Sequence, residues 1–170
     1  MSKSPNVLVT VGSSSSPKLP KQDYDNIHTK YNIGPPASDG SFFNKSVLER
    51  RSSSTDFDSA DTLLYGFFSG KASFTENTSL QKIVSFFQKS DLIDVVVCDF
   101  IVKKNGFDSY LYTHYSDESD IPFFVHARAI HLVNFSNGPS IYQKQIQDIR
   151  SKGCPVFHLA EPVLTLDGRL

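Results

Sequence analysis

Two β-rich runs joined by Asn105-Gly106 constrain the fold of this chain more than any other feature. Residues 93–115 read IDVVVCDFIVKK-NG-FDSYLYTHY. Asn-Gly accepts the positive φ needed at both centres of a type I′ turn, so this stretch predicts a tight β-hairpin. The expected register pairs Lys104 with Phe107, Lys103 with Asp108, Ile101 with Tyr110, Asp99 with Tyr112, and Val97 with His114.

The stretch PFFVHARAIHLVNF, residues 122–135, predicts a third strand. The simplest continuation is a meander, which places Tyr110 opposite His126 and Asp108 opposite Arg128. Side chains alternate between the faces of a strand. The core face then carries Val96, Cys98, Phe100, Val102, Phe107, Leu111, Thr113, Tyr115, Phe123, Val125, Ala127, Ala129, His131, Val133 and Phe135. A mixed outer face carries Val97, Asp99, Ile101, Lys103, Asp108, Tyr110, Tyr112, His114, Phe124, His126, Arg128, Ile130 and Leu132.

Two amphipathic helices are expected to pack on this sheet. TSLQKIVSFFQKS has Thr78 and Gln81 at capping-box spacing and an apolar stripe of Leu80, Ile83, Val84 and Phe87. Residues 137–153 predict a helix with Pro139 near its start and Gly153 after its end. Its stripe is Tyr142, Ile146 and Ile149. The expected fold class is α+β, an antiparallel meander sheet with two helices.

The chain divides by composition near residue 55. Residues 1–60 hold 17 of the AVILMFWYC set, whereas residues 61–170 hold 49. The first part is rich in Ser and Pro, which disfavour helices and ladders, so we expect a largely disordered tail over 1–55 and one α+β domain over 56–170. VLVTV at 7–11 is the one stretch there that could pair as an added strand.

The tail is mildly basic. Residues 1–54 hold seven Lys/Arg against four Asp/Glu. Lys18, Lys21, Arg50 and Arg51 are the candidate contacts to an anionic surface such as phospholipid or nucleic acid, although simple solvation is the commoner role of such charges. Ser52 and Ser53 follow two arginines, the pattern that basophilic kinases recognise, and phosphate there would reverse the local charge.

The sequence predicts a cytoplasmic protein that is not secreted. No apolar run approaches the roughly 18 residues that span a bilayer, and the N-terminus lacks the pattern of a signal peptide. Cys98 lies inside an apolar run and is expected to pack as a small core residue. Cys154 precedes Pro155 at a predicted helix end, so a disulfide is possible, although nothing in the sequence argues for one.

Catalytic, metal and cofactor motifs are not evident. In the expected meander, His114 and His126 lie roughly 13 Å apart, too far for one zinc ion with bonds of about 2 Å. The sequence contains no Gly-x-Ser-x-Gly elbow and no glycine-rich phosphate loop. We therefore expect no cofactor, no metal and no enzymatic activity, with a small cytosolic enzyme kept as an alternative.

The outer sheet face is the candidate partner-facing patch. Tyr110, Tyr112 and His126 could stack on bases and Arg128 could meet phosphates, as single-strand RNA binding requires. The neighbouring acidic residues weaken that electrostatic footprint. Binding of single-stranded RNA by an accessory protein is therefore an alternative to a role in protein assembly.

The layout resembles that of rhabdovirus matrix proteins, especially those of plant viruses. The similarity lies in the order of a Ser/Pro-containing tail, a strand (LLYGFFSGKASF), a capped helix (TSLQKIVSFFQ) and an antiparallel sheet, rather than in a motif. The family's Pro-Pro-x-Tyr signal is absent, and GPPAS matches it only in part. The resemblance implies a structural protein of the virion and host cytoplasm that self-associates, contacts nucleocapsid protein or RNA, and engages the inner membrane surface.

Overall fold

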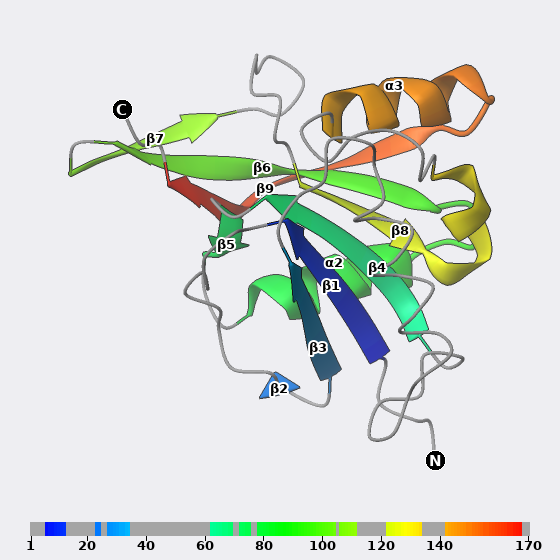
Figure 1. The fold of residues 1–170 in the computed structure, drawn as a ribbon, viewed down its shortest axis with the longest axis horizontal. Coiled ribbons are helices and arrows are strands. Elements are labelled where there is room, and N and C mark those ends of the chain that lie inside the picture. The colour runs from blue at the N-terminus through cyan, green and yellow to red at the C-terminus, as the bar shows by residue number, and fades with distance from the viewer. Residues whose placement is uncertain are drawn as a thin grey trace.

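The described residues form one mixed β-sheet with helices on both faces. A computed structural model describes residues 6–12, 23–24, 27–34, 62–69, 72–75, 78–104, 106–111, 122–133 and 142–167. Figure 1 shows α3 on one side of the sheet and α2 on the other. The α+β class is confirmed, but the sheet is not the antiparallel meander that the sequence predicts.

The sheet combines parallel and antiparallel strands. Its order is β2 (Asp23–Tyr24), β3 (Ile27–Gly34), β1 (Asn6–Gly12), β4 (Thr62–Ser69), β8 (Phe123–His126), β6 (Val95–Lys104), β9 (Val156–Asp167) and β5 (Ala72–Phe74), with β7 (Phe107–Leu111) also paired to β6. β1 runs parallel to β3 and β4, and β6 runs parallel to β9. β8 is antiparallel to both β4 and β6, so those two strands point the same way.

Part of the expected tail lies inside the sheet. β1 sits between β3 and β4, and its Val7 and Val9 are fully buried. The prediction of disorder over 1–55 is therefore wrong for residues 6–12, 23–24 and 27–34. These strands belong to the same sheet as the domain that was expected to begin at residue 56. The added strand at VLVTV is confirmed. The composition averaged over residues 1–60 does not reveal one short apolar strand among Ser- and Pro-rich segments.

The hairpin at Asn105-Gly106 is confirmed in register. Lys104 pairs with Phe107, Lys103 with Asp108, and Ile101 with Tyr110. Gly106 has a φ of 80°, the left-handed value that a type I′ turn needs and that side chains other than glycine rarely accept.

The meander is wrong, because β8 does not pair with β7. Both strands pair with the same edge of β6, one beyond the other: β7 with residues 100–104 and β8 with residues 95–97. Val97 therefore lies opposite Phe123, not His114. At ten residues, β6 is long enough to carry two short strands along one edge.

The two faces of the sheet have separate cores. The α2 face buries Val7, Val9, Leu64, Val96, Cys98, Phe100 and Phe124 against Leu80, Ile83, Val84 and Phe87 of α2 (Ser79–Phe87). The α3 face buries Tyr65, Phe67, Val95, Val97, Phe123 and Val125 with Ile146 and Ile149 of α3 (Tyr142–Ser151). The helix stripes are thus confirmed at these positions, although no side-chain bond caps α2 at Thr78. Phe123 and Val125 lie on the face opposite to Val96, one residue out of the expected register.

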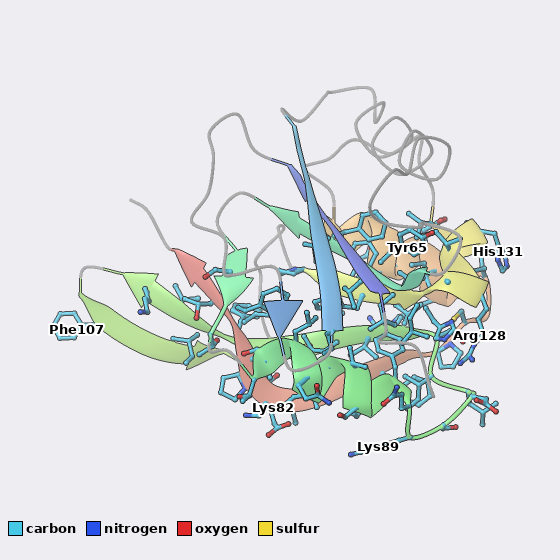
Figure 2. All side chains as sticks on the ribbon, turned by 90° about the horizontal axis from the view of Figure 1, so that it is seen from below. Tyr65, Lys82, Lys89, Phe107, Arg128 and His131 are labelled. Atoms are coloured by element: carbon cyan, nitrogen blue, oxygen red, sulfur yellow. The ribbon has the colours of Figure 1, made fainter. Side chains whose placement is uncertain are left out.

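The third predicted strand ends early. β8 stops at His126, and Ala127–Leu132 forms the 3₁₀ helix η3. His131 is exposed instead of lying in the core (Figure 2). His126 Nδ1 accepts a hydrogen bond of 3.2 Å from the backbone N–H of Arg128, which favours the turn over continued strand.

Candidate functional site

The carboxyl ends of five strands lie toward one edge of the sheet. β1, β3, β4, β6 and β9 share one direction, as the pairings above require. β3 lies on one side of β1 and β4 on the other, so the strand order reverses at β1. In open α/β sheets, ligands bind outside the carboxyl ends of the strands where the order reverses. Gly12 and Ser69, the last residues of β1 and β4, pair at this edge.

Asp99 reaches the same edge from β6. Phe123 of β8 pairs with Phe67 of β4 on one side and with Val97 of β6 on the other. Two residues further along, β4 ends at Ser69 and β6 has reached Asp99. Since β8 begins at Phe123, no described strand lies between Ser69 and Asp99 at this level.

Asp99 is fully buried and bonded to His158. Its exposed fraction is 0%, and its Oδ1 contacts Nε2 of His158, whose side chain is 27% exposed. His158 lies in β9 opposite Val97, so both members of the pair lie next to each other on adjacent parallel strands. The imidazole therefore connects the buried carboxyl group with solvent.

An irregularity in β9 lies beside this pair. Cys98 is paired with Leu159, but the next residue, Asp99, is paired with Pro162, and the register shifts again before Phe100. Such bulges bend a strand and redirect its side chains, and they are frequent next to functional sites. The 59 positions that separate Asp99 from His158 hide the pair from any local sequence pattern.

Cys98 does not supply a nucleophile here. Its complete burial raises the pKa of the thiol, and Asp99 and Glu161 raise it further, so the group stays a neutral thiol at physiological pH. Both cysteines are free, and Cys98 packs in the core as the sequence predicts.

The Asp99–His158 pair has a limited chemical repertoire. The carboxyl oxygens can accept hydrogen bonds from hydroxyl groups, and the bond to Nε2 holds the imidazole in one orientation. An imidazole oriented by a carboxyl group is also the arrangement of a general base. Among the described residues, no three His, Cys, Asp or Glu side chains are grouped to hold a metal ion.

The partner-facing patch expected from the sequence is not one surface. Tyr110 lies opposite Ile101, whereas His126 lies at the level of Asp94, whose carbonyl accepts its backbone N–H. Seven residues along β6 separate these levels, roughly 23 Å at about 3.3 Å per residue. Tyr112 lies outside the described residues. The meander was the only basis for joining these side chains.

Arg128 and His126 tie η3 to the body of the protein. Arg128 Nε pairs with the carboxylate of Asp94, and its Nη2 donates to the carbonyl of Ile93 at 3.1 Å. His126 packs beside the ring of Phe87, with 6.3 Å between centroids. Burial lowers the pKa of His126, and the neighbouring Arg128 lowers it further. Arg128 lies at the end of the sheet away from Phe107 (Figure 2), and both Arg128 and His126 have structural contacts there.

The other predicted contacts lie outside the described residues. These are Lys18, Lys21, Arg50 and Arg51, expected at an anionic surface, and the candidate phosphorylation sites Ser52 and Ser53. Within the parts of the chain that the structure describes, no helix is long and apolar enough to cross a membrane.

Comparison with known proteins gives a fold likeness alone. No protein-family model matches the chain, and no curated protein does. Among solved structures, the chain is similar to A197 from STIV, with 13% sequence identity and a TM-score of 0.55. The match covers 91% of this chain and 82% of A197. At such low identity the likeness supports the architecture of the sheet and its helices, and the site is argued from its own residues.

Proposed function

We propose that the protein binds a nucleotide-type ligand, a phosphorylated and hydroxyl-rich small molecule, at the carboxyl edge of its parallel strands. The observation that carries the proposal is the buried Asp99, bonded to the partly exposed His158, at the level where β1 and β4 end. Open α/β sheets present ligand-contacting groups at the carboxyl ends of their parallel strands.

The energetics of burial favour a role for Asp99 beyond stability. A carboxyl group loses its hydration when it is buried, and a buried polar pair is often no more stabilising than apolar packing of the same volume. Val95, Val97 and Phe100 show that β6 otherwise uses apolar side chains in its buried positions. The partly exposed His158 is therefore the group suited to contact the hydroxyl groups of a sugar, and the buried carboxyl group of Asp99 orients its imidazole.

The sequence around the site provides groups for the rest of such a ligand. β1 ends at Gly12, and four serines, Ser13 to Ser16, follow it in the sequence. Loops after the first strand of this sheet type contribute backbone N–H groups and hydroxyls to phosphate oxygens. In this proposal β1 contributes to the phosphate side and Asp99 with His158 to the sugar side.

The alternative of single-stranded RNA on an open sheet face has less support. Such binding needs exposed aromatic side chains on a sheet face that the bases can reach. Here α2 packs on one face and α3 with η3 on the other, and most aromatic residues between them are buried.

Calorimetric titration tests the proposed function. The full chain is titrated with ADP, GDP, CDP and UDP, each with and without Mg²⁺. We expect at least one to bind with a Kd below about 1 mM, and Asp99→Asn to weaken that binding at least about tenfold, because it replaces the carboxylate that orients His158 with a neutral amide. Asp91→Asn is the matched control, since Asp91 is exposed in the turn after α2.

Two results would refute this function. One is a folded protein, verified by circular dichroism, that binds none of the four nucleotides up to about 10 mM, a concentration that corresponds to negligible affinity. The other is binding that Asp99→Asn and His158→Asn both leave unchanged, which would place the ligand elsewhere.

An assembly role of the matrix type is the second candidate function. The specific observation in its favour is Phe107, which is 75% exposed at the end of the β6–β7 hairpin. Exposed aromatic side chains at projecting positions often anchor protein contacts. The proposed contacts with nucleocapsid, RNA or an inner membrane surface would use the basic residues of the first 54 positions.

A further inference from the structure

The hairpin arm, defined as residues 100–104 and 106–111, carries a strand edge that pairs with no other described strand. Among the described residues, β7 pairs with β6 alone. The arm projects from one end of the sheet, with β7 along its outer side (Figure 1). An unpaired edge presents backbone N–H and C=O groups that can bind another strand.

The register identifies which backbone groups face outward. Residues that flank a two-residue turn, here Lys104 and Phe107, form a hydrogen-bonded pair, and hydrogen-bonded and non-hydrogen-bonded pairs then alternate. The N–H and C=O groups of Asp108 and Tyr110 therefore point away from β6. Those of Phe107, Ser109 and Leu111 are used inside the hairpin.

Three of the features that protect natural edge strands from pairing are missing from β7. These features are a proline, a lysine and a bulge. The five residues of β7, FDSYL, include neither proline nor lysine, and its register with β6 is regular. At its first position Phe107 exposes 75% of its surface, which is costly for a large apolar side chain in water.

We propose that two copies of this chain pair through the outer edges of β7, antiparallel about a twofold axis at Ser109. This arrangement pairs Asp108 with Tyr110 of the partner subunit through the outward backbone groups of both. It also sets Phe107 opposite Leu111 of the partner subunit in the register, so the exposed ring of Phe107 lies at the interface. Asp108, the one charged residue of β7, does not lie opposite Asp108 of the partner subunit, so two copies of the edge can pair without repulsion between like charges.

Sedimentation of the full chain tests this dimer. We expect a reversible monomer–dimer equilibrium for the natural sequence and a dimer for Tyr110→Val, which keeps the backbone N–H. Tyr110→Pro removes the outward N–H of residue 110 and leaves the hydrogen bonds between β7 and β6 in place. We expect it to raise the dimer Kd at least about tenfold, because the twofold axis means that one substitution removes two hydrogen bonds from the interface. A natural chain that stays monomeric up to about 200 μM, a concentration that excludes a dimer of useful affinity, would overturn the proposal.

Disulfide trapping tests the same geometry without proline. At the twofold axis the two Ser109 residues form a non-hydrogen-bonded pair, with Cα atoms about 4.5 Å apart, which a disulfide can bridge. In a Cys154→Ser background, mild oxidation should join Ser109→Cys into a covalent dimer. Leu92→Cys, 76% exposed in the turn after α2, is the control and should stay largely monomeric.

The outcomes separate this surface from others. A dimer that Tyr110→Pro leaves intact, with Ser109→Cys no more cross-linked than Leu92→Cys, would place the interface elsewhere and refute the proposal. Efficient trapping at residue 109 would support it even if Tyr110→Pro failed to fold. Nucleotide binding concerns Asp99 and His158, so neither result depends on the proposed function.

Discussion

The two halves of β6 lie in different surroundings. Residues 95–97 run between β8 and β9 with a hydrophobic core on each face, and all three are buried. Residues 101–103 run between β7 and β9, and exposure rises along them from half-buried Ile101 and Val102 to exposed Lys103. The first half belongs to the body of the protein, and the second leads into the hairpin arm. Asp99 lies at the transition between them.

This difference separates a region of β6 that is fixed by packing from a region that is exposed to partners. In the body, each side chain of β6 contacts one of two cores, so the structure there is fixed from both sides. In the arm, the backbone register is as regular, but the side chains of Lys103 and Phe107 are exposed. We therefore assign ligand contact to the boundary and partner contact to the arm.

A pair of phenylalanine substitutions should show the largest difference between body and arm. Phe124 is fully buried in the core between the sheet and α2, and Phe107 is 75% exposed. We expect Phe124→Ala to lower the free energy of unfolding by about 3–5 kcal/mol, and Phe107→Ala to change it by no more than about 0.5 kcal/mol. Urea denaturation measures both. Equal losses would mean that the arm is packed as firmly as the body.

A substitution at Gly66 should test the packing of the body with a smaller loss of stability. A Cβ atom at Gly66 of β4 would lie 2.9 Å from Cε1 of Phe124 and 3.4 Å from Cγ2 of Val9. Because Phe124 is fully buried and cannot swing aside, we expect Gly66→Ala to cost about 1–3 kcal/mol. Combining it with Phe124→Leu should recover part of that loss, in a double-mutant cycle. Additive effects would show that the ring and the glycine are not in close contact.

Local sequence patterns predict the local structure of this chain well. The Asn-Gly turn alone sets the register of Ile101, Lys103 and Lys104 against β7. The stripe of α2 and the burial of Ile146 and Ile149 follow from helical spacing. In each case the interacting residues are near neighbours in sequence, so one periodicity or one turn geometry determines the result.

Long-range pairings were beyond the reach of such patterns. The position of β1 beside β4 joins segments about 56 residues apart, as Asn6 opposite Thr62 shows. The site has the same character, since His158 meets Asp99 across a bulge in β9. An aspartate inside VVVCDFIV was the one visible signal, and its partner is set only by the parallel pairing of β6 with β9.

Acidification should lower the stability of the body and leave that of the arm unchanged. Its effect should be smaller than those of the Phe124 and Gly66 substitutions. The pKa of His126 is lowered from 6.5 in the folded protein, first by burial and then by Arg128. The unfolded chain therefore binds more protons than the folded one as the pH falls below about 6.5, and stability decreases with falling pH in that window. Above it, the histidine is neutral in both states and contributes no pH dependence.

The structural reason is the cap of η3. Neutral Nδ1 of His126 accepts the N–H of Arg128, and a protonated ring cannot, so acid should cost at most about 1 kcal/mol, the usual worth of such a cap. His126→Asn keeps a capping acceptor that does not titrate, and the stability difference between the two proteins from pH 7 to 5 isolates this group. Hydrogen exchange should then quicken in η3 on acidification and stay constant in β7. Faster exchange in β7 instead would mean that the arm, and not the body, senses the proton.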